Sequence, residues 1–573
     1  MKHRDISSIG SGEKLRVDLA IVGAGPAGLA IAHSLAGSGI GILLVESGGM
    51  ATKPGPQSLN AVERVGPDRS GGDREPGRGY DGIFAWLNEV PAFELRNRGV
   101  GGSTATWAGK CADFQAIDFE RRDWVPHSGW PTQRADFDGY LDRAAALLGL
   151  GPNVYDERLG PMTRSALPPA GIDAGRLAPF FWQFSLSKSG GPLRLRETFL
   201  SFQAPNVTVL THATVTEIVT DADGSRVRHL RIAGPEGRRA IVRPRFTVLC
   251  AGAVENARLL LASNAARPQG IGNDRGLVGR YLCDHPRTAV CRLPQDQGHR
   301  IQSAFGFYAL RRRHGGHRYL RGVTLPAALQ RRERLLNCAA YLVRTHSDAD
   351  PWAALKRQMS GSPSARDLMR VAASPGLLAR GLLRHGVMGR SVLHLTTGMR
   401  FDAMVEQVPN PDSRVTLSAR TDQFGGPLPR IDWRIGELEA RTVARLAQLL
   451  AEEFEHAGFS PPLLPEWVRE RRFEDAPFID MGHPSGTTRM ADDPSRGVVD
   501  ARGKVFGVEG LFVAGSSTFP TPGHANPTLM IVAQSMRVAD ALKEELAQAS
   551  ATYAVSPVGP AARAAVRQSV HSA

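Results

Sequence analysis

Cysteine and long apolar runs are scarce in this chain of 573 residues. Its five cysteines lie far apart and form no CxxC pair, which argues against a disulfide framework or a thiolate metal site. No stretch approaches the roughly 18 uninterrupted apolar residues of a membrane-spanning helix, and no apolar signal segment follows the charged N-terminus. These absences predict a cytoplasmic protein without a bound metal.

Lysine is scarce as well, because only eight of the 70 basic residues are lysines, yet the net charge is +14 at pH 7. Positive charge is densest in residues 311–334, where neither an aromatic platform nor a known nucleic-acid motif accompanies it. We interpret this segment as a solvated basic face and expect no nucleic-acid partner. An anionic partner or a lipid surface is the alternative, so contact with a membrane surface stays open.

The length predicts two or three domains. Residues 17–46 have the pattern of a strand, a glycine turn, an Ala-rich helix and a second strand, which is a βαβ unit of a covered parallel sheet. Residues 206–250 change to alternating strands with a hairpin turn at 221–224. Residues 503–546 return to strand, glycine turn and helix. One large cofactor that contacts segments hundreds of residues apart explains this order.

We therefore predict an α/β fold, in which a Rossmann-like cofactor domain carries an inserted substrate domain of antiparallel sheet plus helices. The cofactor domain is assigned residues 1–130, 205–292 and 475–546. The substrate domain is assigned residues 131–204 and 293–474, including strand-like segments at 414–418 and 429–433. The Ala/Ser/Pro-rich end, residues 547–573, is expected to be disordered.

A glycine motif, GAGPAG, separates the first strand from the first helix. Its cofactor-binding candidates are Gly23, Gly25, Pro26, Ala27 and Gly28. Glycines at this spacing permit a tight turn and a close approach to a pyrophosphate, and the helix N-terminus then faces the phosphates. Glu46 ends the second strand 18 residues after the motif, where a carboxylate can accept hydrogen bonds from an adenosine ribose. This pattern alone does not distinguish FAD from NAD.

Further glycine clusters contribute more candidates for cofactor contact. The segment GVGGSTATWAG contains Gly101, Gly102, Ser103 and Trp107, and two later strand ends contain Ala251 with Gly252 and Gly515 with Ser516. Three junctions of strand, glycine and helix are more than packing usually requires. The last helix begins at Asn526, Pro527 and Thr528, with Asn as a favoured N-cap and Pro as a favoured first residue. Its N-terminus suits a developing negative charge.

Among sixteen histidines, His483 is the strongest candidate for chemistry, because it lies in the loop HPSGTTRM, where an imidazole can face a pocket. We interpret His285, in CDHP, as structural.

Taken together, these motifs resemble the glucose–methanol–choline (GMC) oxidoreductase family. GAGPAG with Glu46, GVGGSTATW, LCAGAVENARLLL, HPSGTTRM and VAGSSTFPTPGHANPT occur in the family's order, across residues 17–546. The resemblance implies bound FAD, with His483 and Asn526 facing the flavin from positions 43 residues apart. It also implies that Val215 touches the adenine. His524 is a weaker second member of the pair.

The resemblance implies hydride transfer from an alcohol to the flavin, with His483 as base and Asn526 as a hydrogen-bond donor. Some relatives link the flavin covalently to a histidine where this chain has Thr106, so we expect noncovalent FAD. A sugar, aminosugar or related polyol is the expected substrate, and the electron acceptor, oxygen or another, stays open. A lipid-like alcohol is an alternative because residues 368–395 are apolar and basic. Two further alternatives for the function are a non-redox lyase and an FAD-binding protein that relays electrons.

Overall fold

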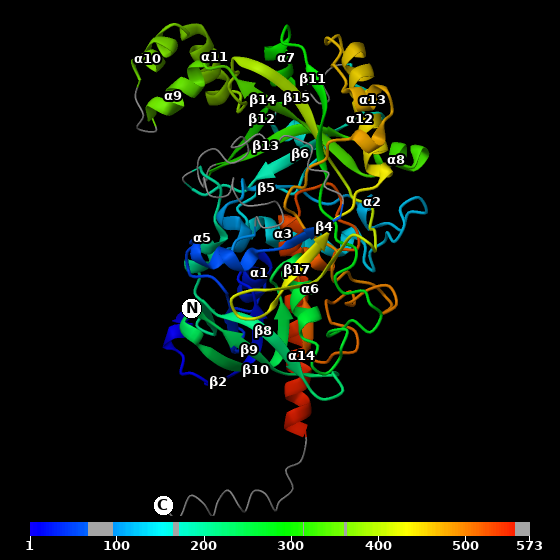
Figure 1. Ribbon diagram of the computed structural model, residues 1–573. Coiled ribbons are helices and arrows are strands. Elements are labelled where there is room, and N and C mark those ends of the chain that lie inside the picture. Colours follow the sequence, from blue (N-terminus) through cyan, green and yellow to red (C-terminus); the bar gives the residue numbers. More distant parts are fainter. Residues whose placement is uncertain (67–95, 164–170, 189, 313–314, 360–363, 556–573) are drawn as a thin grey trace, which may run out of the picture.

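The chain builds two regions, each on its own β-sheet, and Figure 1 shows them at opposite ends of the computed structural model. The structure describes residues 1–66, 96–163, 171–188, 190–312, 315–359 and 364–555. Successive segments of the chain alternate between the two sheets. The predicted α/β architecture with a second, antiparallel sheet is confirmed.

The first sheet is mainly parallel. Its strands run in the order β1 (Lys2–Asp5), β7 (Val207–Thr211), β3 (Ile42–Val45), β2 (Lys14–Val22), β10 (Arg239–Leu249), β9 (Val227–Ala233) and β8 (Thr214–Thr220), with β18 (Leu511–Val513) paired to β10. The predicted βαβ unit is present as β2, α1 (Pro26–Ser34) and β3, and Leu19 lies opposite Ile42 in parallel register. The predicted hairpin joins the antiparallel strands β8 and β9.

The last helix, α14 (Thr528–Val555), packs against α1 and α3 (Asp138–Leu147). Its apolar stripe is buried as the helical spacing predicts, at Leu529, Val532, Met536, Ala539 and Leu542. The helix continues to Val555, so the expected start of a disordered tail at 547 is wrong. The Ala-rich sequence sustains the helix because alanine has the highest helix propensity. Residues 556–573 lie outside the described residues.

The second sheet is antiparallel. Its strands run in the order β11 (Arg287–Leu293), β15 (Thr396–Val405), β14 (Cys338–His346), β13 (Gly315–Thr324), β6 (Ala178–Phe184) and β5 (Lys110–Cys111), with β12 (Phe307–Arg312) paired to β13. Helix α12 (Glu437–His456) packs against β11, β14 and β15. The Arg-rich segment 311–334 belongs to this region as the end of β12, β13 and α8 (Ala327–Glu333), apart from residues 313–314, which are not described.

A third sheet has three short strands, β16 (Arg414–Thr421), β17 (Pro427–Asp432) and β4 (Glu63–Val65). The two strand-like segments predicted here are confirmed, but β16 and β17 pack against α6 (Ala253–Ala262) of the cofactor region. The two strands thus contact the cofactor region, although residues 293–474 were assigned to the substrate domain. Burial against α6 decides their position, which local sequence does not record.

Other predicted boundaries also shift. Lys110 and Cys111 form β5 of the second sheet, although residues 1–130 were assigned to the cofactor domain. Conversely, α3 packs on α14, and α5 (Leu195–Leu200) packs on α1, although both fall in segments assigned to the substrate domain. The chain crosses between the two sheets within these segments, so one domain boundary cannot separate the residues of the first sheet region from those of the second.

The remaining helices are short. They are α2 (Ala116–Phe119), α4 (Leu159–Thr163), α7 (Gly298–Ala304), α9 (Pro351–Met359), α10 (Ala365–Ala372), α11 (Pro375–Gly386) and α13 (Glu466–Arg469). The 3-10 turns are η1 (Ile6–Ser8), η2 (Gly55–Asn60), η5 (Gly102–Ala105), η6 (Arg134–Phe137), η7 (Pro235–Gly237), η8 (Phe473–Asp475) and η9 (Ser516–Thr518). Within the described ranges, no helix combines the length and the apolar character needed to cross a membrane.

Candidate active site

The predicted glycine turn joins β2 to α1 at the carboxyl end of the first sheet. Gly23 has a φ of 102°, a region that favours glycine. A Cβ on Gly28 would lie 2.0 Å from the carbonyl oxygen of Gly23, so glycine is required for this close packing. A Cβ on Gly25 would meet no atom within 4 Å. Open space therefore lies before the first turn of α1, which begins with Pro26 and Ala27.

A second glycine segment closes on this turn from residues 101 and 102. The N–H of Gly101 donates to the carbonyl of Ala24 over 2.9 Å. A Cβ on Gly102 would lie 2.8 Å from the Cα of Gly25. The start of η5 and the start of α1 are thus in direct backbone proximity.

Two later glycine junctions reach the same region. A Cβ on Gly515, just after β18, would lie 3.5 Å from the Cβ of Ala27. Gly252 precedes α6 with a φ of 85° and faces open space, and Ala251 lies beside it. Four glycine segments from distant parts of the chain therefore surround one helix N-terminus. Small residues, free space and N–H donors suit an extended dinucleotide such as FAD.

A pocket opens beside the glycine turn. Gly23, Val215 and Ala251 all line it, so these three cofactor candidates lie together. Charged and polar residues that were not among the candidates also line it, including Ser47, Arg98, Glu255 and Arg258.

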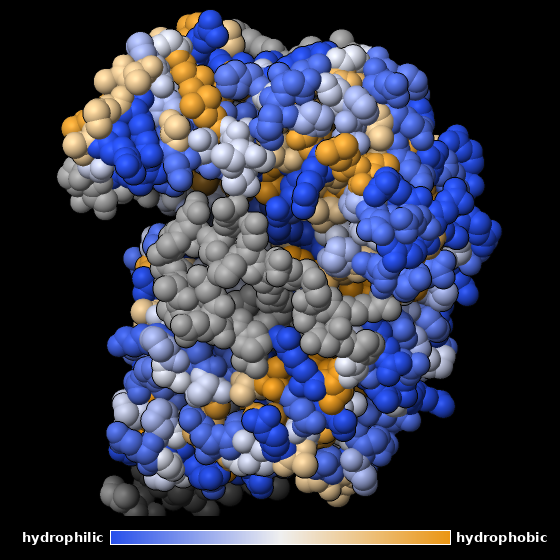
Figure 2. Space-filling model, turned by 45° about the horizontal axis from the view of Figure 1, so that its top comes forward, coloured by the Kyte–Doolittle hydropathy of each residue, from blue (hydrophilic) through white to orange (hydrophobic). Residues whose placement is uncertain are grey.

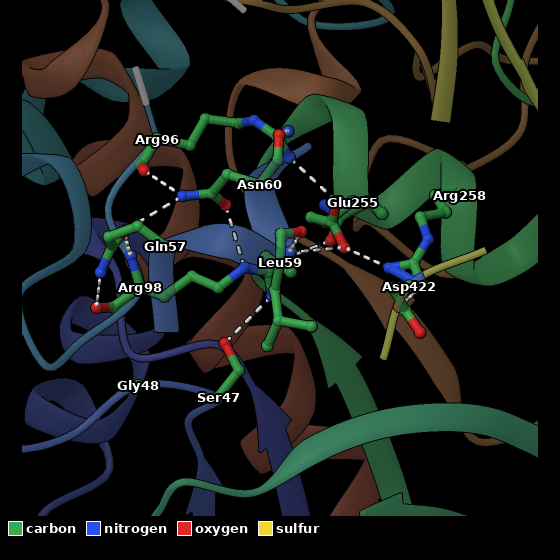
Figure 3. Close-up of polar contacts among 12 residues, drawn as sticks. Ser47, Gly48, Gln57, Leu59, Asn60, Arg96, Arg98, Glu255, Arg258 and Asp422 are labelled. Atoms are coloured by element: carbon green, nitrogen blue, oxygen red, sulfur yellow. Dashed lines mark hydrogen bonds and ion pairs between the residues drawn. The ribbon is translucent and has the colours of Figure 1, made fainter. Parts of the chain in front are cut away.

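An arginine network forms one wall of this pocket (Figure 3). Glu255 pairs with Arg96 at 2.9 Å, with Arg98 at 3.1 Å and with Arg258 at 3.1 Å. Burial opposes ionisation of Glu255, but these three guanidinium groups hold its pKa well below the usual range. Arg98 also donates to the hydroxyl of Ser47 at 3.0 Å. Through the bond to Ser47, the network connects the pocket to the end of β3, the second strand of the βαβ unit. Its members are close to the glycine motifs in sequence.

Glu46 is buried and has more partners than the sequence implied. Its carboxylate accepts the N–H of Ala24 at 2.8 Å, of Gly48 at 2.8 Å and of Gly99 at 2.9 Å. These donors belong to three different loops. Glu46 therefore holds the glycine turn and the next glycine segment together, and contact with a ribose stays a prediction.

The loop that carries His483 is fixed by backbone bonds on both sides. Gly486 donates to the carbonyl of Ser516 at 3.0 Å, which joins the loop to η9. The buried carboxylate of Asp284 accepts the N–H of Met481 at 3.2 Å and of His483 at 2.9 Å. The predicted imidazole thus stands on a braced loop.

His285, interpreted from the sequence as structural, contacts His483 directly. The Nδ1 atoms of the two rings are 3.2 Å apart, and Nε2 of His285 is 3.1 Å from the carbonyl oxygen of Pro522. A carbonyl only accepts, so Nε2 of His285 must carry the proton. The Nδ1 of neutral His285 is then an acceptor, and His483 must donate from its own Nδ1. This leaves a free lone pair on Nε2 of His483.

The environment keeps both rings neutral. Burial lowers the pKa of His285 to about 4. Burial is the main cause that lowers the pKa of His483 well below its usual range, and repulsion from the charge of Lys110 adds to it. Asp284, His285 and His483 hold possible ligand atoms within 4.8 Å of one another. Since the Asp284 carboxylate is already committed to backbone N–H groups, the arrangement suits proton transfer better than metal binding.

Asn526 and His524 are buried without hydrogen-bond partners at their key atoms. Within the described residues, Oδ1 of Asn526 and both ring nitrogens of His524 bond to nothing. Asn526 therefore does not cap α14 as expected; the helix starts at Thr528, and Ile531 donates to the carbonyl of Pro527 at 2.8 Å. Because buried polar groups are normally paired, these atoms indicate a place for a ligand. Burial lowers the pKa of His524 to about 3.

Lys110 is the functional candidate that sequence reasoning missed. Its ammonium lies 3.6 Å from the ring centre of Tyr341 and 4.2 Å from that of Trp182. Burial and the nearby charge of Arg287 lower its pKa well below the usual range. The sequence feature that could have identified Lys110 is its position at the end of the GVGGSTATWAGK segment, where the motif does not require a lysine.

The other predicted residues lie around these centres with their own partners. The indole N–H of Trp107 donates to the carbonyl of Leu193 at 2.7 Å, and the hydroxyl of Ser516 donates to the carbonyl of Pro484 at 2.8 Å. Ser103 is exposed in η5. Thr528 begins α14, directly after Pro527. Ser516 thus connects the His483 loop to the Gly515 junction.

Comparison with known proteins gives a consistent picture. Two family models described as GMC oxidoreductase match residues 195–287 and 409–535. The 6'''-hydroxyparomomycin C oxidase of Streptomyces lividus is 23% identical and covers 96% of this chain and 95% of its own. The paromamine 6'-oxidase of Streptomyces fradiae is 25% identical and covers 92% of each chain. The fructose dehydrogenase large subunit of Gluconobacter japonicus is 23% identical, covering 94% of this chain and 100% of its own.

Solved structures share the fold. A formate oxidase variant from Aspergillus oryzae has a TM-score of 0.54 at 16% identity and covers 94% of this chain and 99% of its own. Pyridoxine 4-oxidase, from the source given as Mesorbium loti, has a TM-score of 0.51 at 19% identity, with 92% and 99% covered. At these identities the likeness shows the fold alone.

Proposed function

This chain belongs to the GMC oxidoreductase family, whose members bind FAD, and from that premise we propose that it oxidises the CH–OH group of a sugar, aminosugar or related polyol with His483 as the base. Its relatives are oxidases and dehydrogenases. The observation that carries the proposal is the chain from Pro522 through His285 to His483, which leaves Nε2 of His483 free to accept a proton.

Gly23, Gly25 and Gly102 would hold the pyrophosphate of FAD, and Val215 would contact its adenine. When bound, FAD supplies the acceptor for the hydride that leaves the alcohol carbon. His483 accepts the hydroxyl proton at Nε2, so that the carbon–oxygen bond becomes a carbonyl as the hydride departs. The braced loop orients this atom before substrate arrives, which reduces the entropic cost of the step.

Asn526 supports the developing charge on the substrate oxygen. Its side chain is buried, and its Oδ1 has no partner in the described part of the chain. The unpartnered Oδ1 is an acceptor for a donor group of the ligand, and the Nδ2 group of the same amide would donate one hydrogen bond to the forming alkoxide, an effect worth about 10²–10³-fold in rate. Helix α14 begins at Thr528, two residues after Asn526, and the positive end of its dipole would favour negative charge nearby.

The sugar-like substrate is supported by the relatives and by the polar group that Lys110 offers. Aromatic rings and a buried ammonium stand together, through Trp182, Tyr341 and Lys110. Lys110 covers both rings and Trp182 is fully buried, so the amine of Lys110 is the group that would donate to substrate hydroxyls. The aminoglycoside-oxidising and fructose-oxidising relatives support the same class.

The test is anaerobic flavin reduction by a panel of sugars and polyols, followed by absorbance. His483→Ala should retain FAD, since no predicted phosphate or ribose contact is lost, but reduction should slow about 10²–10⁴-fold. Asn526→Ala should slow it less. His229→Ala, on β9 of the first sheet, is the matched control and should behave as the parent. A His483→Ala holoenzyme reduced at the parental rate would overturn the assignment, and a parent that no alcohol bleaches would favour a lyase or a relay protein.

We also propose that the FAD is noncovalent. Thr106 occupies the position where some relatives carry the linking histidine, and its hydroxyl accepts a hydrogen bond from Asn97 at 2.6 Å. Acid precipitation of the holoenzyme should release the yellow chromophore into the supernatant. Colour that stays with the protein pellet would show a covalent link.

A further inference from the structure

Helices α9, α10 and α11, with the residues up to Met388, form a projection that stands apart from the first sheet in Figure 1. This helical projection is inserted between the neighbouring strands β14 and β15. Nine large hydrophobic side chains are exposed in the described part of the chain, and six of them belong to it: Leu368, Met369, Leu382, Leu383, Val387 and Met388. Figure 2 shows hydrophobic and hydrophilic residues side by side over this projection.

Helix α10 buries a charged face and exposes an apolar face. Its inward face carries Asp367, which is buried and pairs with Arg357 of α9 at 2.8 Å and with Arg370 at 2.9 Å. Its outward face is apolar at i, i+3, i+4 and i+7, and all four residues are exposed: Ala365, Leu368, Met369 and Ala372. A water-facing helix normally has the opposite arrangement.

Helix α11 continues this apolar surface. It packs on α9 through Gly381, where a Cβ would lie 2.1 Å from the ring of Trp352. That contact turns the neighbouring leucines outward, and Leu382 is 65% exposed while Leu383 is 53% exposed. The apolar surface of two helices therefore faces solvent without a partner in the described chain.

The charge around this surface has one sign. Residues 351–390 contain seven Lys and Arg residues and a single acidic residue, Asp367. Because Asp367 is buried in ion pairs, the surface of the projection is strongly positive. Arg366 and Arg380 are exposed and form no ion pair with any described residue. Apolar helical faces flanked by free arginines are typical of helices that lie in the interface of a membrane with anionic lipids.

We propose that the helical projection docks on an anionic lipid bilayer, with the outward faces of α10 and α11 buried among the acyl chains and Arg366 and Arg380 at the headgroups. A second copy of the chain is a poorer occupant, because it would bring two strongly positive surfaces together without compensating acids. This inference does not depend on the proposed oxidation, since none of the active-site residues belongs to the projection.

The experiment is vesicle flotation of the holoenzyme. Phosphatidylcholine vesicles with about one third phosphatidylglycerol are compared with pure phosphatidylcholine, at about 0.05 M and about 0.5 M NaCl. The patch variant replaces four exposed apolar residues: Leu368→Ser, Met369→Ser, Leu382→Ser and Leu383→Ser. The matched control replaces exposed apolar residues elsewhere: Met162→Ser, Leu200→Ser and Leu463→Ser. A charge variant, Arg366→Glu with Arg380→Glu, alters exposed side chains only.

The parent and the control should float with the anionic vesicles, less so at high salt and hardly at all with pure phosphatidylcholine. The patch variant and the charge variant should each partition at least tenfold more weakly while retaining flavin. Equal flotation of parent and charge variant would overturn the proposal, as would a parent that does not float. A parent dimer that the patch variant converts to monomer in sedimentation would identify a second copy as the occupant and also refute it.

Discussion

Replacement of His285 tests the reasoning about the active site most directly. In the structure its Nδ1 accepts the hydrogen bond that the His483 ring donates, over 3.2 Å. His285→Leu removes that acceptor and leaves a donor of His483 without a partner. His285→Asn returns an acceptor, because the amide oxygen of Asn occupies roughly the place of the histidine Nδ1.

The size of the effect follows from the hydrogen bond that is lost. An unsatisfied buried donor costs about 1–3 kcal/mol, and each 1.4 kcal/mol is tenfold in rate, so the range is about 5- to 150-fold. Since 3.2 Å is at the long end for such a bond, we expect a loss of about 5- to 30-fold in anaerobic flavin reduction by His285→Leu. His285→Asn should stay within a few-fold of the parent.

The pH profile separates this positioning role from a merely structural one. His483 has a lowered pKa, so the reduction rate of the parent should fall only at pH values below its ordinary 6.5. Neutral His285 accepts a hydrogen bond that becomes stronger when His483 is charged, so His285→Leu should move the acid limb to lower pH, whereas His285→Asn should leave it close to that of the parent. Stopped-flow reduction across pH, on holoenzyme with verified flavin content, measures both quantities. Parental rates and an unmoved acid limb in His285→Leu would refute the hydrogen-bond chain.

Two further substitutions test residues around the cofactor and substrate. Glu46→Gln places an amide N–H against backbone donors that now bond a carboxylate, so FAD affinity of the apoprotein, measured by titration, should fall about 10-fold or more; the exposed Glu197→Gln is the control, and unchanged affinity would contradict the role of Glu46. Lys110→Met removes a cation that lowers the pKa of His483, so the acid limb of the reduction rate should move to higher pH and KM for polyols should rise; an unaltered profile and KM would place Lys110 outside the site.

Local patterns in the sequence determined the elements that depend only on neighbouring residues. The βαβ unit, the hairpin after residue 220 and the buried stripe of α14 were all predicted, since each follows from periodicity and turn residues within a short window. The glycine candidates were found for the same reason. Gly25 and Gly102 lie at one helix N-terminus, where a Cβ on Gly102 would come within 2.8 Å of the Cα of Gly25.

Contacts between distant residues were not predictable in this way. His285 lies 198 positions from His483, and nothing in CDHP indicates that its ring fixes the proton of another histidine. Lys110 belongs to a segment that looked like cofactor loop but enters the second sheet as β5. Both roles depend on which strands the tertiary fold places side by side.

The helical projection is a second case in which local sequence does not determine the tertiary contacts. An apolar spacing like that of α10 normally marks the face that packs inward, because burial of apolar surface is the usual driving force. The tertiary structure instead places Asp367 inside, where Arg357 from another helix pairs with it, and leaves Leu368 and Met369 exposed. The sequence alone determined that α10 is amphipathic. Only the packing of α9 and α11 decided which face meets the solvent, since a buried ion pair needs a partner that local periodicity does not specify.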